Sequence, residues 1–131
     1  MTEYLDREDV LTAGSAAVGQ VVQVGDYGLL DAAVARPRTT VFGLDAYPDL
    51  FTKAAALLQL LARNHALVDG NKRTAWASAW VFLSLNGVAL SEFDVDDAAV
   101  FMNDVATDGG LEIDDIAAKL SSYAAPSRPA P

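Results

Sequence analysis

Cysteine is absent from this chain, so disulfide bonds, thiolate metal sites and cysteine nucleophiles are all excluded. Basic residues are few, nine against eighteen acidic ones, and the net charge of −9 argues against a non-specific nucleic-acid binder. Long apolar runs are also missing, because stretches such as 54–58 are far shorter than the roughly 20 residues of a membrane-spanning helix. The first six residues lack the basic and then apolar order of a signal peptide. We therefore expect a cytoplasmic protein that binds neither nucleic acid nor membrane.

The chain is long enough to bury one hydrophobic core and too short for two, with 131 residues of which 52% are hydrophobic. We predict a single all-α domain over residues 1–123, a compact bundle of about six helices, followed by a disordered tail over 124–131. Apolar spacing, capping residues and helix-stopping glycines and prolines place the helices at about 6–19, 26–36, 48–63, 71–87, 94–107 and 112–123.

Two neighbouring segments of this pattern have a distinct composition. The helix over 48–63 is apolar nearly all round, which indicates that it lies at the centre of the bundle. Residues 37–48 hold two prolines, a glycine and a β-branched run, which is typical of a loop or a small pair of strands. We expect this second segment to flank the cleft that holds the functional residues.

Polar residues are concentrated between the two most apolar helices, in the stretch 63–75. Gly70 can adopt a positive φ, and the helix start that follows it would turn backbone N–H groups outward into a site that favours an anion. Lys72 and Arg73 stand beside this site, where a point charge and a bidentate guanidinium can hold two successive phosphates. The stretch therefore predicts a phosphate-binding loop.

The single histidine of the chain, His65, lies in the same stretch. A neutral imidazole can accept the proton of an attacking serine or threonine hydroxyl, and Asp69 can orient the imidazole or hold Mg²⁺ on the phosphates. Each residue also has a plainer explanation when taken alone. A histidine between helices is more often a packed or capping residue, and residues 69–71 form an ordinary turn. Lys72 and Arg73 alone would usually be a solvated helix face.

Taken together, residues 65–73 resemble the Fic/Doc family motif, His-x-Phe-x-(Asp/Glu)-(Ala/Gly)-Asn-(Gly/Lys)-Arg. Lys72 favours the Doc (death-on-curing) branch, since the adenylylating branch has glycine there and a second arginine where this chain has Trp76. Leu67 replaces the usual phenylalanine and Ala66 a common proline, so we expect a somewhat looser loop. The similarity covers most of the chain to about residue 87 and includes residues 26–30, 36–37, 42–43 and 51–55.

The resemblance implies a toxin of a toxin–antitoxin system that uses ATP and Mg²⁺ to phosphorylate a serine or threonine of a translation factor. Elongation factor Tu is the implied target, and a separate antitoxin protein is the implied partner. The catalytic residues it implies are His65, Asp69, Lys72 and Arg73, with Asp69 as the metal ligand. The nucleotide-binding residues it implies are Gly70, Asn71, Lys72 and Arg73. Two alternatives stay open: transfer of AMP to a protein hydroxyl, and a non-catalytic module that binds an antitoxin.

Overall fold

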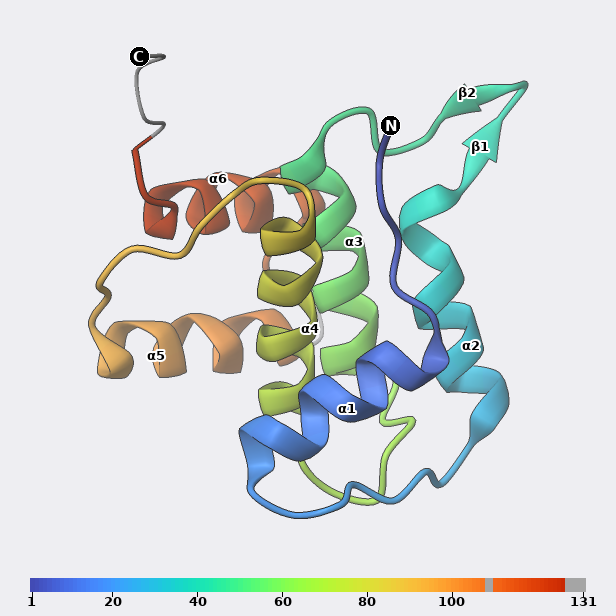
Figure 1. Cartoon of the computed structure of the whole chain (residues 1–131), viewed down its shortest axis with the longest axis vertical. Coiled ribbons are helices and arrows are strands. Elements are labelled where there is room, and N and C mark those ends of the chain that lie inside the picture. Colours follow the sequence, from blue (N-terminus) through green and yellow to red (C-terminus); the bar gives the residue numbers. More distant parts are fainter. Residues whose placement is uncertain (108–109, 127–131) are drawn as a thin grey trace.

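The computed structural model describes residues 1–107 and 110–126 and places six α-helices in them (Figure 1). The helices are α1 (Arg7–Val18), α2 (Tyr27–Ala35), α3 (Leu50–Arg63), α4 (Asn71–Leu85), α5 (Val95–Ala106) and α6 (Ile113–Tyr123). Between α2 and α3 lie a short 3₁₀ helix and an antiparallel hairpin, namely η1 (Arg36–Arg38), β1 (Thr40–Val41) and β2 (Leu44–Asp45). The predicted all-α bundle of about six helices is confirmed, and so is the small strand pair within 37–48.

Aspartate side chains start four of the helices. The side chain of each accepts a hydrogen bond from a backbone N–H group in the first turn; the four residues are Asp6, Asp26, Asp49 and Asp94. Such a cap stabilises a helix by about 1 kcal/mol. At its other end, α1 stops at Gly19, which has a left-handed backbone. Because these signals are local, every helix boundary falls within two residues of its predicted position. Pro48 precedes the cap of α3, so the predicted helix began two residues too early.

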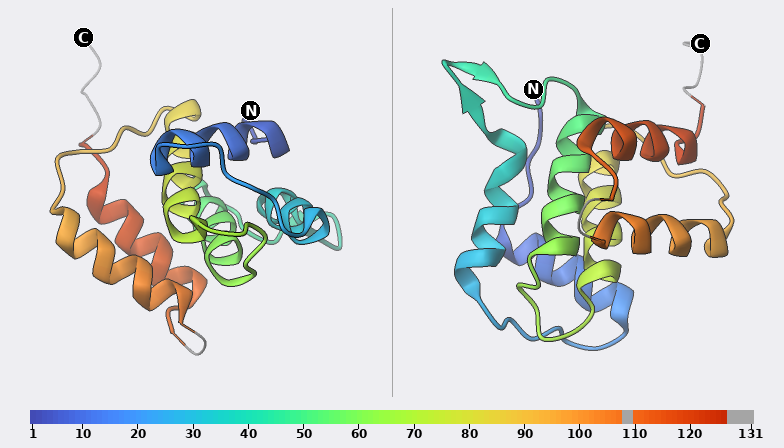
Figure 2. Two further views of the ribbon diagram at one scale, coloured as in Figure 1. Left: turned by 90° about the horizontal axis from the view of Figure 1, so that it is seen from below. Right: turned by 180° about the vertical axis from the view of Figure 1, so that it is seen from behind.

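α3 lies at the centre of the molecule, as predicted, with four other helices packed against it (Figures 1 and 2). Ten of its fourteen residues are buried. The tryptophans of α4 belong to the same core, because Trp80 is 6% exposed and Trp76 packs against Phe93 and Tyr123 with ring centroids 5.2 and 5.4 Å apart. Because α3 is packed on several sides, the loop that follows its C-terminal end has a fixed position.

The close crossing of α1 and α4 depends on Gly14. A Cβ added there would lie 2.4 Å from Oγ1 and 2.8 Å from Cγ2 of the buried Thr74. Although alanine is normally the better helix former, we expect Gly14→Ala to lower the free energy of unfolding by about 1 to 3 kcal/mol because of this overlap. Urea denaturation measures the loss, and a Gly14→Ala/Thr74→Ala variant should recover part of it. Unchanged stability in Gly14→Ala would show that the helices can separate without cost.

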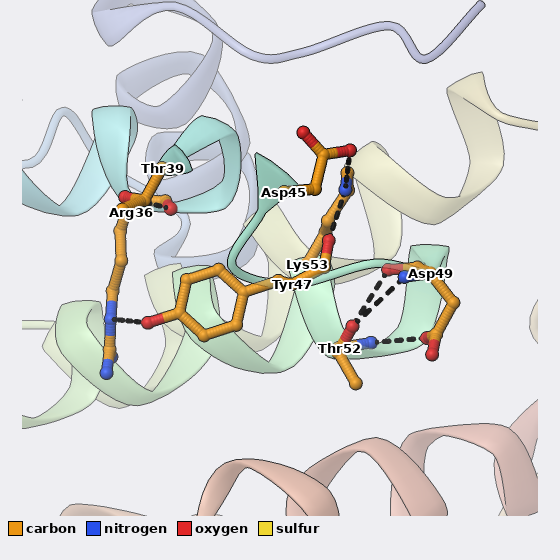
Figure 3. A network of polar contacts seen from close by, with 7 residues as sticks. All are labelled: Arg36, Thr39, Asp45, Tyr47, Asp49, Thr52 and Lys53. Atoms are coloured by element: carbon orange, nitrogen blue, oxygen red, sulfur yellow. Dashed lines mark hydrogen bonds and ion pairs between the residues drawn. The ribbon is translucent and has the colours of Figure 1, made fainter. Parts of the chain in front are cut away.

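A buried lysine ties the hairpin to the first half of α3 (Figure 3). The side chain of Lys53 is 3% exposed, and its Nζ lies 3.1 Å from Oδ2 of Asp45 and also donates to the carbonyl of Tyr47. The hydroxyl of Tyr47 in turn accepts from Nε of Arg36 at 3.1 Å. These bonds hold the hairpin beside the N-terminal end of α3.

The hairpin and the loop that leads from α3 into α4 lie at opposite ends of α3 (Figures 1 and 2). α3 has 14 residues, so a rise of 1.5 Å per residue separates its ends by about 20 Å. The prediction that residues 37–48 flank the functional cleft is therefore wrong. The reason is geometric, because the segments before and after one straight helix emerge at its two ends.

Paired backbone continues slightly beyond α6. Ala124 forms a bridge with Leu90, and the N–H of Ala125 donates to the carbonyl of Ala89 at 2.8 Å. The predicted tail over 124–131 therefore starts too early, and residues 127–131 lie outside the described part of the chain. None of the helices in the described ranges combines the length and the apolar character needed to cross a bilayer.

Candidate functional site

The connection between α3 and α4, residues 64–70, is pinned to the segment that precedes α2. Three backbone hydrogen bonds of 2.8 to 3.0 Å join Ala66 and Val68 to residues 23–26. Ala66 and Leu67 are 1% and 4% exposed. Leu67 therefore anchors the loop in the core even though it is smaller than the phenylalanine of the family motif.

The side chain of Asn71 fastens the same loop from the α4 side. Its Oδ1 accepts from the backbone N–H of Leu67, and its Nδ2 donates to the carbonyl of Leu67, both at 3.0 Å. One amide thus satisfies both backbone groups of a loop residue that is shielded from water. The side chain of Asn71 is therefore engaged within the loop.

We expect Asn71→Asp to lower the free energy of unfolding by about 1 to 3 kcal/mol, because a carboxylate cannot donate to the carbonyl of Leu67. Aspartate in the first turn of a helix is otherwise favourable, so a loss of stability would identify the amide bond as its cause. Urea denaturation at neutral pH measures the change. If Asn71→Asp is as stable as the wild type, the two bonds do not hold the loop.

His65 is exposed and has a positive φ of 52°, a conformation that histidine adopts more readily than most residues. The residue before it, Asn64, closes α3 with a bond from its N–H to the carbonyl of Leu60, and its Nδ2 donates to the carbonyl of Leu29 at 2.8 Å. On the other side of His65, Ala66 is fixed by backbone pairing. Both neighbours therefore hold the histidine in its strained conformation, as is common for residues at functional sites.

Gly70 turns the chain into α4 with a φ of 80°, in the left-handed region. The carbonyl of Gly70 accepts the first intrahelical bond, from Thr74 at 2.9 Å. No side chain of the described residues caps this helix start, so the N–H groups of residues 71–73 are open to an outside acceptor. A helix start of this kind is suited to binding an anion.

The predicted site residues come together in one cleft of about 560 Å³, a size typical of small-molecule sites. All six of them line it: His65, Asp69, Gly70, Asn71, Lys72 and Arg73. Lys72 and Arg73 are exposed at its edge, and Nζ of Lys72 donates to Oδ1 of Asn103 in α5 at 2.7 Å. In a protein with a net charge of −9, the two cations at a helix N-terminus make a local positive site.

Asp69 contributes a carboxylate to the cleft. Its Oδ1 accepts from the N–H of Gly70 at 2.8 Å, which leaves Oδ2 for a ligand. No hydrogen bond joins Asp69 to His65 in the described ranges, and no cluster of three or more metal-binding side chains occurs there. A cation beside Asp69 would need further oxygen ligands from outside the protein, such as water or phosphate oxygens. Mg²⁺ fits this requirement, since one or two carboxylates and the substrate phosphates commonly hold it.

Two residues near the motif have structural roles, and one distant residue reaches the site. Nε and one terminal nitrogen of Arg63 donate to the carbonyls of Val105 and Leu111 at 2.7 and 2.9 Å, so Arg63 ties α3 to the end of α5. Asn64, as described above, ties α3 to α2. Asn103 lies 31 positions beyond Lys72 in the sequence. Such a distance explains why no local pattern marked Asn103 as part of the site.

Comparison with known proteins agrees with the motif. The model of the Fic/DOC family matches residues 3–83. The chain is 69% identical to the Toxin Doc of Mycolicibacterium smegmatis over 126 residues, which is 95% of this chain and 96% of that protein. It is also 33% identical to the Protein kinase doc of Escherichia phage P1 over 117 residues, 87% of this chain and 90% of that protein. The chain therefore belongs to the Fic/Doc family.

Proposed function

We propose that this protein is the toxin of a toxin–antitoxin system and acts as a phosphotransferase that moves the γ-phosphate of ATP to a serine or threonine hydroxyl. The observation that carries the proposal is the single cleft in which His65, Asp69 and the uncapped start of α4 meet. The names of the two relatives, a toxin and a protein kinase, support the same activity.

In the proposed reaction His65 accepts the proton of the hydroxyl while the hydroxyl oxygen forms a bond to the γ-phosphorus. The bond between that phosphorus and the bridging oxygen to the β-phosphate breaks, and ADP leaves with the electron pair. Lys72, Arg73 and the N–H groups at the start of α4 stabilise the charge on the transferred group. Mg²⁺ bound by Asp69 and the phosphates would neutralise further charge.

The target that we propose is a translation factor in the cytoplasm, with elongation factor Tu as the first candidate, so that phosphorylation arrests translation. Restraint of the toxin would come from a separate antitoxin chain. The sequence supports inhibition by a separate chain, because it lacks the inhibitory Ser/Thr-x-x-x-Glu helix motif of many Fic proteins.

The intact mass of elongation factor Tu after incubation with the protein and Mg-ATP tests the proposal, with an EDTA-treated sample as control. A phosphate-sized gain that requires Mg²⁺ is the expected result. A nucleotide-sized gain would instead establish AMP transfer, the alternative within the same family. An unchanged mass, with the antitoxin still bound by the protein, would favour a non-catalytic binding module.

A further inference from the structure

The three lysines of the chain have partners of two different kinds. Lys53 and Lys119 form salt bridges with aspartates, with distances of 3.1 and 3.0 Å between Nζ and Oδ2. Nζ of Lys72 instead donates to the amide oxygen of Asn103 at 2.7 Å, and no salt bridge of the described residues includes Lys72. An amide can orient an ammonium group without cancelling its charge, so the charge of Lys72 stays available to an anion.

Asn103 belongs to a helix that is well fixed in the fold. Its neighbours Met102 and Val105 are 6% and 0% exposed, so they anchor α5 in the core. The carbonyl of Val105 accepts from Nε of Arg63 at 2.7 Å. The carbonyl of Asn103 itself accepts from Oγ1 of Thr107 at 2.8 Å. The amide of Asn103 is therefore carried by a backbone with a fixed position, although the residue is exposed.

Lys72 needs such a partner because of where it lies. It is an exposed residue in the first turn of α4, and the ammonium of an exposed lysine moves freely on its flexible four-carbon stem. The bond to Asn103 holds the ammonium at the edge of the cleft that Lys72 lines, beside the uncapped start of α4. A charge that is already in place loses less freedom when an anion binds, so the bond favours binding.

We propose that Asn103 is a positioning residue that acts through Lys72 and presents its ammonium to the phosphates of ATP, an inference that rests on the proposed function. The ammonium has three N–H groups, so one bond to Asn103 leaves two for phosphate oxygens. Asn103 lies in α5, outside the residues 3–83 that match the family model. Phosphate binding therefore depends on a part of the chain that the family motif does not include.

A double-mutant cycle tests the proposal through the binding of Mg-ATP to the full chain, measured by calorimetry without a target protein. Asn103→Leu removes the acceptor with little change in size, Lys72→Met removes the ammonium, and a third variant combines both changes. Asn103→Asp keeps an acceptor and adds a negative charge. Val100→Leu is the matched control, since it also places leucine at an exposed position of α5. Urea denaturation of each variant checks that the fold is retained.

We expect Asn103→Leu to weaken Mg-ATP binding about three- to tenfold, the effect of losing one hydrogen bond, and Lys72→Met to weaken it at least about tenfold. In the Lys72→Met protein, Asn103→Leu should have no further effect, because Asn103 acts only through the ammonium. Asn103→Asp should weaken binding at least as much as Asn103→Leu, since its carboxylate offsets the charge of Lys72. Val100→Leu should bind Mg-ATP as tightly as the wild type.

Equal losses from Asn103→Leu in the wild type and in the Lys72→Met protein would show that Asn103 acts independently of the ammonium, and the inference would fail. It would also fail if Asn103→Leu or Lys72→Met bound Mg-ATP as tightly as the wild type, or if Asn103→Asp bound it more tightly. In each of these cases the proposed function stands. If the wild type binds no Mg-ATP, the proposed function fails together with the inference.

Discussion

Replacement of His65 by asparagine is expected to reduce phosphoryl transfer by about 100- to 10,000-fold, the range typical of losing a general base, with little change in stability. Asparagine tolerates the left-handed backbone that His65 adopts at φ 52°. Because the histidine is exposed, the substitution removes the proton acceptor without opening a cavity. Initial rates of phosphate incorporation into elongation factor Tu measure the first effect, and urea denaturation measures the second.

His65→Ala is the matched control for the backbone. Alanine lacks both the imidazole and the tolerance of asparagine for a positive φ, so we expect it to be less stable than His65→Asn by about 1 kcal/mol and equally inactive. A folded His65→Asn protein that transfers phosphate within tenfold of the wild-type rate would show that another group, or water, accepts the proton.

The positions of the helices could be predicted because the signals that set them lie next to the boundaries. Asp6 and Asp26 cap helices that start one residue later, and Gly19 ends α1 with a left-handed backbone. The same is true of Gly70, whose positive φ and helix start were expected from the sequence. Residues 65–73 are contiguous, so their common location in one cleft also follows from local structure.

Contacts between distant segments could not be predicted in this way. Arg63 is the last residue of α3, and the carbonyls that it binds lie 42 and 48 positions away in the sequence. Lys53 reads as a polar residue in an apolar helix, yet it is buried because the hairpin folds back over it. The hairpin itself was expected beside the cleft, at the wrong end of α3, because that expectation rested on residue types and not on the two ends at which the chain enters and leaves a straight helix.

Asn71 shows that the structural role of a motif residue can differ from the one that its type suggests. The family resemblance predicts that Asn71 binds the nucleotide, and this stays a prediction. In the structure its side chain bonds both backbone groups of Leu67. The motif therefore combines residues that face the cleft, such as Arg73, with residues that hold the loop in shape.

Gly70→Ala is expected to lower the free energy of unfolding by about 2 to 5 kcal/mol, a sum of two costs. A left-handed backbone costs an L-residue about 1 to 2 kcal/mol, and Gly70 has a φ of 80°. Its new Cβ would also lie 2.8 Å from Cγ2 of Val18, and relieving such a clash costs about 1 to 3 kcal/mol. Phosphoryl transfer should fall as well, because the N–H groups at the start of α4 depend on this turn.

Two further variants separate these costs by urea denaturation. Gly87→Ala places alanine at a similar φ of 90° with no atom within 4 Å of its Cβ, so it should show the backbone cost alone. Val18→Ala removes the clashing methyl groups, so Gly70→Ala/Val18→Ala should be more stable than the sum of the two single changes predicts, by about 1 kcal/mol or more. Strict additivity would mean that α1 yields to the new Cβ. The loss at Gly70 would then come from the backbone of the turn itself, and the contact with α1 would not shape the N-terminal end of α4.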